Sequence, residues 1–163
     1  MKNRMTERNL FWFVVGAIFG SVVIYYLPTE PAFAATANSG DKFSMCTVRT
    51  SVGASEAIFV LDQVTGRLLG AQHSLQRNAF HQLYQRNLAA DFGVTDNARY
   101  VMVSGDIQTG GGGGAAPPAQ GAIYVAELNA GVVFMYGFTM SPAGQAGPPR
   151  ELIPLASFPF RGN

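Results

Sequence analysis

The chain has 163 residues, and its basic and acidic side chains nearly balance, leaving a formal net charge of +1. This balance excludes the strongly basic surface that nucleic-acid binding requires. The single cysteine, Cys46, cannot form an intramolecular disulfide or a cysteine-based metal site. The length is sufficient for one domain with a modest core.

The first element expected is a hydrophobic helix. Residues Leu10–Leu27 contain no charged side chain, and a helix of that length rises about 27 Å, close to the hydrocarbon thickness of a bilayer. Basic residues precede this segment and Glu30 follows it, so residues 1–9 are expected in the cytoplasm and the remainder outside. The sequence therefore predicts a single-pass transmembrane signal-anchor over residues 10–27, in the cytoplasmic (inner) membrane, with the lipid bilayer as a partner.

A cleaved signal peptide is the alternative interpretation of this segment. Ala32-Phe33-Ala34 forms an A-x-A pattern just after it, and cleavage near Ala34 would secrete the domain. The apolar run is longer than the core of a usual signal peptide, which favours the uncleaved anchor. Gly16 and Gly20 have the G-x-x-x-G spacing that lets two membrane helices approach closely, so they form a candidate helix-dimer face for a homo-oligomer.

An internal repeat dominates the part of the chain that follows. Residues 28–42 are small, polar and proline-containing, which predicts a linker before a β-rich extracytoplasmic domain over 43–140. Within that domain, the pattern of Ala57–Gly66 returns 65 positions later as Ala122–Gly131. Each copy predicts a hairpin whose acid accepts hydrogen bonds from the turn backbone and whose glycine adopts a positive φ. The structural turn residues are then Asp62, Gly66, Glu127 and Gly131.

A different pattern separates the two hairpins. Apolar residues recur there at helical spacing, at Phe80, Leu83, Tyr84 and Leu88. Each hairpin also has a candidate strand before it. We therefore expect an α+β fold, in which one amphipathic helix lies between two pseudo-repeated three-stranded antiparallel units, 43–73 and 99–138. The apolar stripe should pack on the sheet, which leaves Gln82 in solvent.

Two segments have the composition of loops or extended chain. Gly110–Gly114 is a run of glycines, which predicts a flexible insert whose shortening would change stability little. Residues 141–163 contain five prolines and are expected to form an extended proline-rich tail.

The hairpins resemble the D-x-x-T-G hairpins of β-propeller blades of the quinoprotein type. Asp62, Thr65 and Gly66 match that pattern, whereas the second copy keeps only the acid and the glycine and has Ala130 in place of the threonine. Two such units cannot close a propeller, which needs at least four blades.

A longer stretch, about Ala57 to Arg161, resembles an uncharacterised family of membrane-anchored extracytoplasmic proteins from planctomycete-type bacteria. The segments that carry this resemblance are Phe59–Asp62 with Thr65-Gly66, Arg86–Ala89, Tyr100–Val103, Ile123–Glu127 and Phe158–Arg161. The resemblance implies a shared domain and anchor, and it implies no functional site.

No catalytic constellation is evident in the sequence. His73 and His81 lack a convincing third metal ligand, and no serine lies in a G-x-S-x-G motif. We therefore expect no enzymatic activity, no cofactor and no metal. His81 should lie in solvent on the polar side of the predicted helix.

Two functions remain open. The first is a membrane-tethered structural or protein-interaction module with other membrane or periplasmic proteins as partners. The second is a small-ligand binding or sensing domain on the outer face of the cytoplasmic membrane. Its groove would lie between the two units and would use Arg49, Arg99 and Tyr100.

Overall fold

The computed structural model describes residues 12–21, 37–51, 56–94, 96–107, 117–141 and 147–162. The chain divides into two compact units, Met1–Ala34 and Ala35–Asn163. In the first unit, residues 12–21 are helical and contain Gly16 and Gly20. Among the described residues, no helix is long and apolar enough to cross a membrane. The predicted transmembrane helix is therefore not found in the described part of the chain. The ends of its 10–27 span and the pattern at Ala34 lie outside the described residues.

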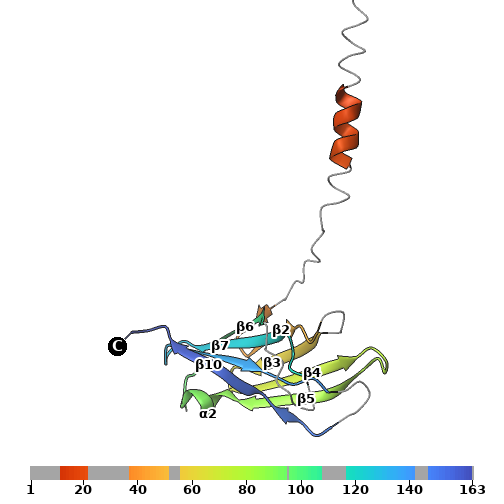
Figure 1. Ribbon diagram of the computed structural model, residues 1–163. Coiled ribbons are helices and arrows are strands. Elements are labelled where there is room, and N and C mark those ends of the chain that lie inside the picture. Colours follow the sequence, from red (N-terminus) through yellow and green to blue (C-terminus); the bar gives the residue numbers. More distant parts are fainter. Residues whose placement is uncertain are drawn as a thin grey trace, which may run out of the picture. The chain divides into compact units, whose positions relative to one another are not determined.

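The second unit contains two β-sheets (Figure 1). The larger one, sheet A, has the strand order β1-β2-β3-β4-β5-β9, and the smaller one, sheet B, has the order β10-β8-β7-β6. The strands of sheet A are β1 (Ala37–Ser39), β2 (Phe43–Val48), β3 (Ala57–Asp62), β4 (Arg67–Ser74), β5 (Ala79–Asn87) and β9 (Arg150–Glu151). Those of sheet B are β6 (Tyr100–Asp106), β7 (Gly121–Glu127), β8 (Val132–Gly137) and β10 (Ile153–Pro159). Neighbouring strands are antiparallel, apart from the parallel pair of β5 and β9.

The expected α+β class is wrong, because the second unit is mostly β. The segment predicted as an amphipathic helix is strand β5, and the helix α2 occupies only Leu88–Phe92. The register between β4 and β5 shifts between Gln72 and His73, which leaves His81 as an extra residue. This bulge breaks the two-residue alternation of the strand. Apolar residues from both faces of β5 therefore fall at intervals that resemble a helix.

The short helix α2 has standard caps. The Asn87 side chain accepts a hydrogen bond from the Ala90 N–H, and Gly93 ends the helix in the left-handed conformation. This local chemistry reverses the chain after β5 and brings Phe92 onto sheet B. The Phe92 ring lies 4.9 Å from that of Phe134 and 5.8 Å from that of Tyr100.

The three strands expected in each repeat are present, but a fourth strand follows them in each sheet, and sheet A also contains β1 and β9. In sheet A, β5 follows β2-β3-β4, and in sheet B, β10 follows β6-β7-β8. Strand β10 comes from the proline-rich tail. The sheets are two separate meanders that face each other, and they are not units placed on either side of a helix.

The core lies between the inner faces of the two sheets. Phe59 of β3 and Tyr84 of β5 both contact the ring of Phe138, at centroid distances of 5.2 and 5.0 Å. Cys46 is buried in the same core, and burial raises the pKa of its thiol to about 11, so this thiol stays protonated near neutral pH. Strand β2 lies against β6, so the two sheets meet along these strands.

Candidate functional site

The first repeat ends in a hydrogen-bonded turn around Asp62. Its Oδ1 accepts hydrogen bonds from the backbone N–H of Val64 and Thr65, and its Oδ2 accepts one from the Thr65 hydroxyl at 2.7 Å. The hydrogen bond from Thr65 is the main reason that the pKa of Asp62 is lowered. Gly66 closes the turn with φ of 67°. This carboxylate therefore serves the turn through three hydrogen bonds.

The second repeat places Glu127 and Gly131 in the corresponding turn. The Glu127 carboxylate is buried and accepts hydrogen bonds from the N–H groups of Arg99 and Ala130. Gly131 has φ of 68°, close to the value at Gly66. Because these acids bond to backbone within their own sheets, the arrangement provides structure and no open site.

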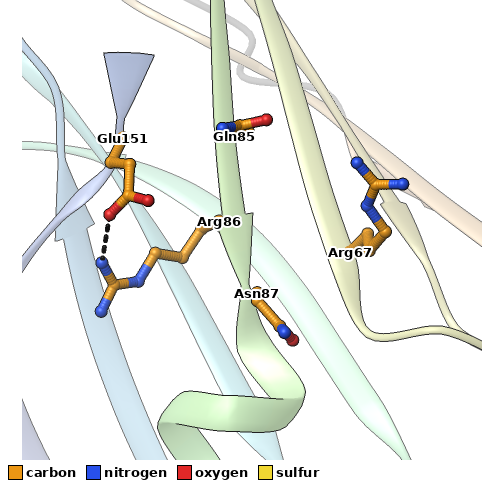
Figure 2. A pocket seen from close by; sticks show the side chains of 5 residues that line it. All are labelled: Arg67, Gln85, Arg86, Asn87 and Glu151. Atoms are coloured by element: carbon orange, nitrogen blue, oxygen red, sulfur yellow. Dashed lines mark hydrogen bonds and ion pairs between the residues drawn. The ribbon is translucent and has the colours of Figure 1, made fainter. Parts of the chain in front are cut away.

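The described residues include an open polar pocket of about 270 Å³ at the α2 end of sheet A (Figure 2). It is lined by Arg67, Gln85, Arg86, Asn87 and Glu151. Figure 2 shows Arg67 and Arg86 on opposite sides of β5, with Glu151 directed at Arg86. The pocket therefore does not combine its two guanidinium groups into one anion-binding cradle.

Arg86 is already neutralised by carboxylates of its own chain. Its Nε and Nη2 donate to the two oxygens of Asp91 at 2.7 and 2.6 Å, and its Nη1 lies 3.3 Å from Glu151. The hydrogen bond to Asp91 is the main reason that the pKa of Arg86 is raised. An incoming anion would have to displace the bidentate Asp91 carboxylate, which is a strong competitor.

This ion pair also joins the two sheets. The Tyr136 hydroxyl of sheet B donates to Asp91 Oδ2 at 2.8 Å. Burial is the largest cause of the raised pKa of Tyr136, and the hydrogen bond to Asp91 adds to it. The three side chains form a chain from β5 through α2 to β8 that holds the domain together.

The ligand residues expected from the sequence do not converge. Arg49 pairs with Asp106, at the end of β6, at 3.4 Å. Arg99 precedes the other end of the same strand, which is about 20 Å away at the usual rise per residue. Tyr100 is buried in the core, and its hydroxyl has no hydrogen-bond partner among the described residues. The expected groove between the units is occupied by core side chains.

The histidines behave differently from expectation. His81 is buried at the bulge of β5, so the prediction that it lies in solvent is wrong. Its two ring nitrogens find no hydrogen-bond partner in the described part of the chain. His73 lies on the other face of sheet A, edge-on to Phe80 at 5.8 Å. No group of three metal-ligating side chains occurs in the ranges that the structure describes.

The outer face of sheet A, turned away from the core, is largely apolar. We call it the A face. Its apolar side chains are Met45, Ile58, Val60, Leu69, Ala71 and Leu83, and the same face also carries the polar side chains of Thr47, Asp62, Arg67, His73 and Gln85. They are half-buried or exposed, and the inward-pointing residues between them form the core. No described residue covers this face as a further layer.

The outer face of sheet B, called here the B face, has the same character. The side chains on it are Val101, Val103, Tyr124, Ala126, Val133, Met135 and Phe158. Val103 is 47% exposed and Phe158 is 57% exposed. A solvated sheet face normally alternates polar residues with the buried ones. The two largely apolar outer faces are therefore the candidate functional surfaces of this domain.

Comparison with known proteins identifies no relative: no family model, no curated protein and no solved structure matches the chain. The expected resemblance to propeller blades and to a planctomycete-type family therefore stays a prediction.

Sequence reasoning missed the two outer faces, although a signal for them was present. The central strands read AIFVLD and GAIYVAE, which are continuous apolar runs. Such runs are typical of strands covered on both sides. Reading them only as hairpin strands overlooked the second covered side.

Proposed function

We propose that this chain is a protein-interaction module on the outer face of the cytoplasmic membrane, acting through its A and B faces and without catalysis. The observation that carries the proposal is the apolar character of both outer faces of the sandwich. At about 25 cal/mol per Å² of apolar surface, covering either face with a partner would supply a substantial part of a binding free energy.

The N-terminal segment supports the proposed location. An uncharged run from Leu10 to Leu27, preceded by basic residues, is typical of a segment that directs a chain into or across the cytoplasmic membrane. Both uncleaved retention at the membrane and release after cleavage near Ala34 place the domain outside the cytoplasm. A C-terminal alkaline phosphatase fusion should be active in cells, and a mature N-terminus at Ala35 in mass spectrometry would establish release.

The interaction itself can be tested by site-specific photo-crosslinking of the full chain in cells. A photoreactive residue at Val103 samples the B face, and one at Leu69 samples the A face; both side chains are 47% exposed. The matched control is Val64 in the β3–β4 turn, which is 76% exposed but lies on neither face.

We expect adducts of protein mass from Val103 and Leu69 and none from Val64. Light-dependent loss of the unmodified chain without any protein adduct at either face would refute the proposal. Equal labelling from Val64 would also refute it, because general stickiness would then explain the adducts.

A further inference from the structure

The two sheets match each other strand for strand, in register. Val60 pairs with Leu69 across β3 and β4, and 65 positions later Val125 pairs with Phe134 across β7 and β8. The first strands match too, since Asp62 pairs with Phe43 and Glu127 pairs with Tyr100. Each sheet therefore contains one copy of the same four-stranded unit, to which sheet A adds β1 and β9 at its edges.

The backbone hydrogen bonds outside the strands repeat as well. In sheet A, the residue after β5 donates from its N–H to the carbonyl of Gly66 at 2.8 Å. In sheet B, the residue after β10 donates to the carbonyl of Gly131 at 2.8 Å. The equivalence therefore includes the fourth strand, where no sequence similarity reveals it.

Equivalent residues of the two sheets lie on opposite sides of the core interface. Phe59 and Leu61 point from sheet A into the core, but their equivalents in sheet B lie on the B face. Conversely, Val125 and Ile123 point from sheet B into the core, whereas their equivalents in sheet A lie on the A face. The two sheets therefore pack front to back, and not front to front.

This arrangement leaves one front and one back uncovered. The B face is equivalent to the side that sheet A already packs onto sheet B. The A face is equivalent to the inner side of sheet B, against which sheet A packs. The internal interface thus shows which surface fits the B face, namely an A face.

We infer that the B face of one copy binds the A face of a second copy of this chain, head to tail, and that the succession closes into a ring. This inference rests on the proposed function and names its partner. Front-to-back contacts between identical units form a ring when the rotation closes. Rings of four-stranded sheets contain about 4–8 sheets, so two sheets per copy give a ring of two, three or four copies.

The chemistry of the two faces agrees with this partner. Most side chains on both faces are aliphatic or aromatic. The residues that define the B face include no charged side chain, and the charged residues of the A face, Asp62 and Arg67, are register partners next to the β3–β4 turn. Within one copy β2 lies against β6. Across the proposed contact, β6 of one copy should therefore lie against β2 of the next.

The test uses the full chain purified in mild detergent, with its mass measured by native mass spectrometry. The wild-type chain should form one closed species of two to four copies. Val103→Glu on the B face and Leu69→Glu on the A face should each be monomeric, because every head-to-tail contact needs both faces. Val64→Glu should assemble like the wild type, and circular dichroism should show all three variants folded.

Mixing the two monomeric variants distinguishes a head-to-tail contact between an A face and a B face from a contact between two identical faces. Each variant retains one intact face, so the mixture should form one-to-one pairs that do not grow. If instead one single variant stayed oligomeric while the other became monomeric, the contact would join identical faces and the inference would be overturned. A monomeric wild-type chain would also overturn it. In that case, adducts of a different protein at Val103 in the crosslinking experiment would leave the proposed function intact.

A second measurement does not depend on charge substitutions. Met45→Cys on β2 and Val103→Cys on β6 replace exposed side chains on the two faces, while the native Cys46 is buried. Oxidation of the double variant in membranes should give a ladder ending at the ring size. A mixture of the two single variants should stop at a linked dimer. The inference would be contradicted if the double variant gave no more disulfide-linked species than the chain without the introduced cysteines.

Discussion

Gln82 and Leu83 are neighbours on β5 whose contributions to stability should be opposite to what their hydropathy implies. Gln82 is fully buried, and its Nε2 donates to the carbonyl of Leu83 at 2.9 Å and to that of Pro148 at 3.0 Å. Leu83 is 49% exposed on the A face. The bulge at His81 places the amide inside and the leucine outside.

The magnitudes follow from these contacts. Gln82→Ala removes two hydrogen bonds worth about 1 kcal/mol each and leaves a small cavity, partly offset by removing the buried Oε1 that has no partner among the described residues. We expect Gln82→Ala to lower the free energy of unfolding by about 2 kcal/mol. Leu83→Ala removes a half-exposed side chain, which should cost about 0.5–1 kcal/mol.

Both losses of stability can be measured by thermal unfolding, monitored by circular dichroism. For a domain of this size Tm should fall by about 8 °C for Gln82→Ala and by about 2–4 °C for Leu83→Ala. The Tm values of the two variants should be compared at high dilution, where association does not contribute to the apparent stability. A Leu83→Ala loss equal to or above that of Gln82→Ala would refute the assignment of β5.

Three further predictions test the turns and the polar link. Asp91→Ala should lower stability by about 2 kcal/mol, since it unpairs partly buried groups on both sheets, whereas exposed Asp96→Ala should change it by less than about 0.5 kcal/mol; urea denaturation measures both. Gly66→Ala should lower the free energy of unfolding by about 1 kcal/mol more than Gly93→Ala, as measured by thermal unfolding. Both glycines have positive φ, but only at Gly66 would the new Cβ meet neighbours at 3.0 Å. The lowered pKa of Asp62 means that its contribution is present above the unfolded pKa near 3.8 and disappears as the pH falls through the lower folded value, so Asp62→Asn should flatten the acid decline of Tm.

The strands of both hairpins could be predicted, because the residues that specify each hairpin lie within the hairpin itself. Each has a short apolar run, an acid at the start of the turn and a glycine at its end, as at Asp62 and Gly66. Strand β5 could not be predicted, because one bulge residue shifts every later side chain to the other face. The spacing of its apolar residues then fits a helix, although Phe80 lies outside and Tyr84 inside.

Strand β10 was missed for a different reason. Pro154 and Pro159 argue against a strand in the interior of a sheet, but β10 is an edge strand, where a missing N–H is tolerated. The link from Arg86 through Asp91 to Tyr136 was also beyond sequence reasoning. Its members lie on β5, α2 and β8, and nothing in their spacing shows that these elements meet.

The meander topology has a consequence for the order in which the domain is made. Strands β2 to β5 are consecutive in the chain, so they can pair with one another before β6 is synthesised. Only β9 joins sheet A later, beside β5. Because a chain emerges from its N-terminus first, sheet A should form while the strands of sheet B are still being synthesised. For that interval both sides of a finished apolar sheet are bare, and the nascent domain depends on rapid delivery of β6 to β10 to avoid aggregation.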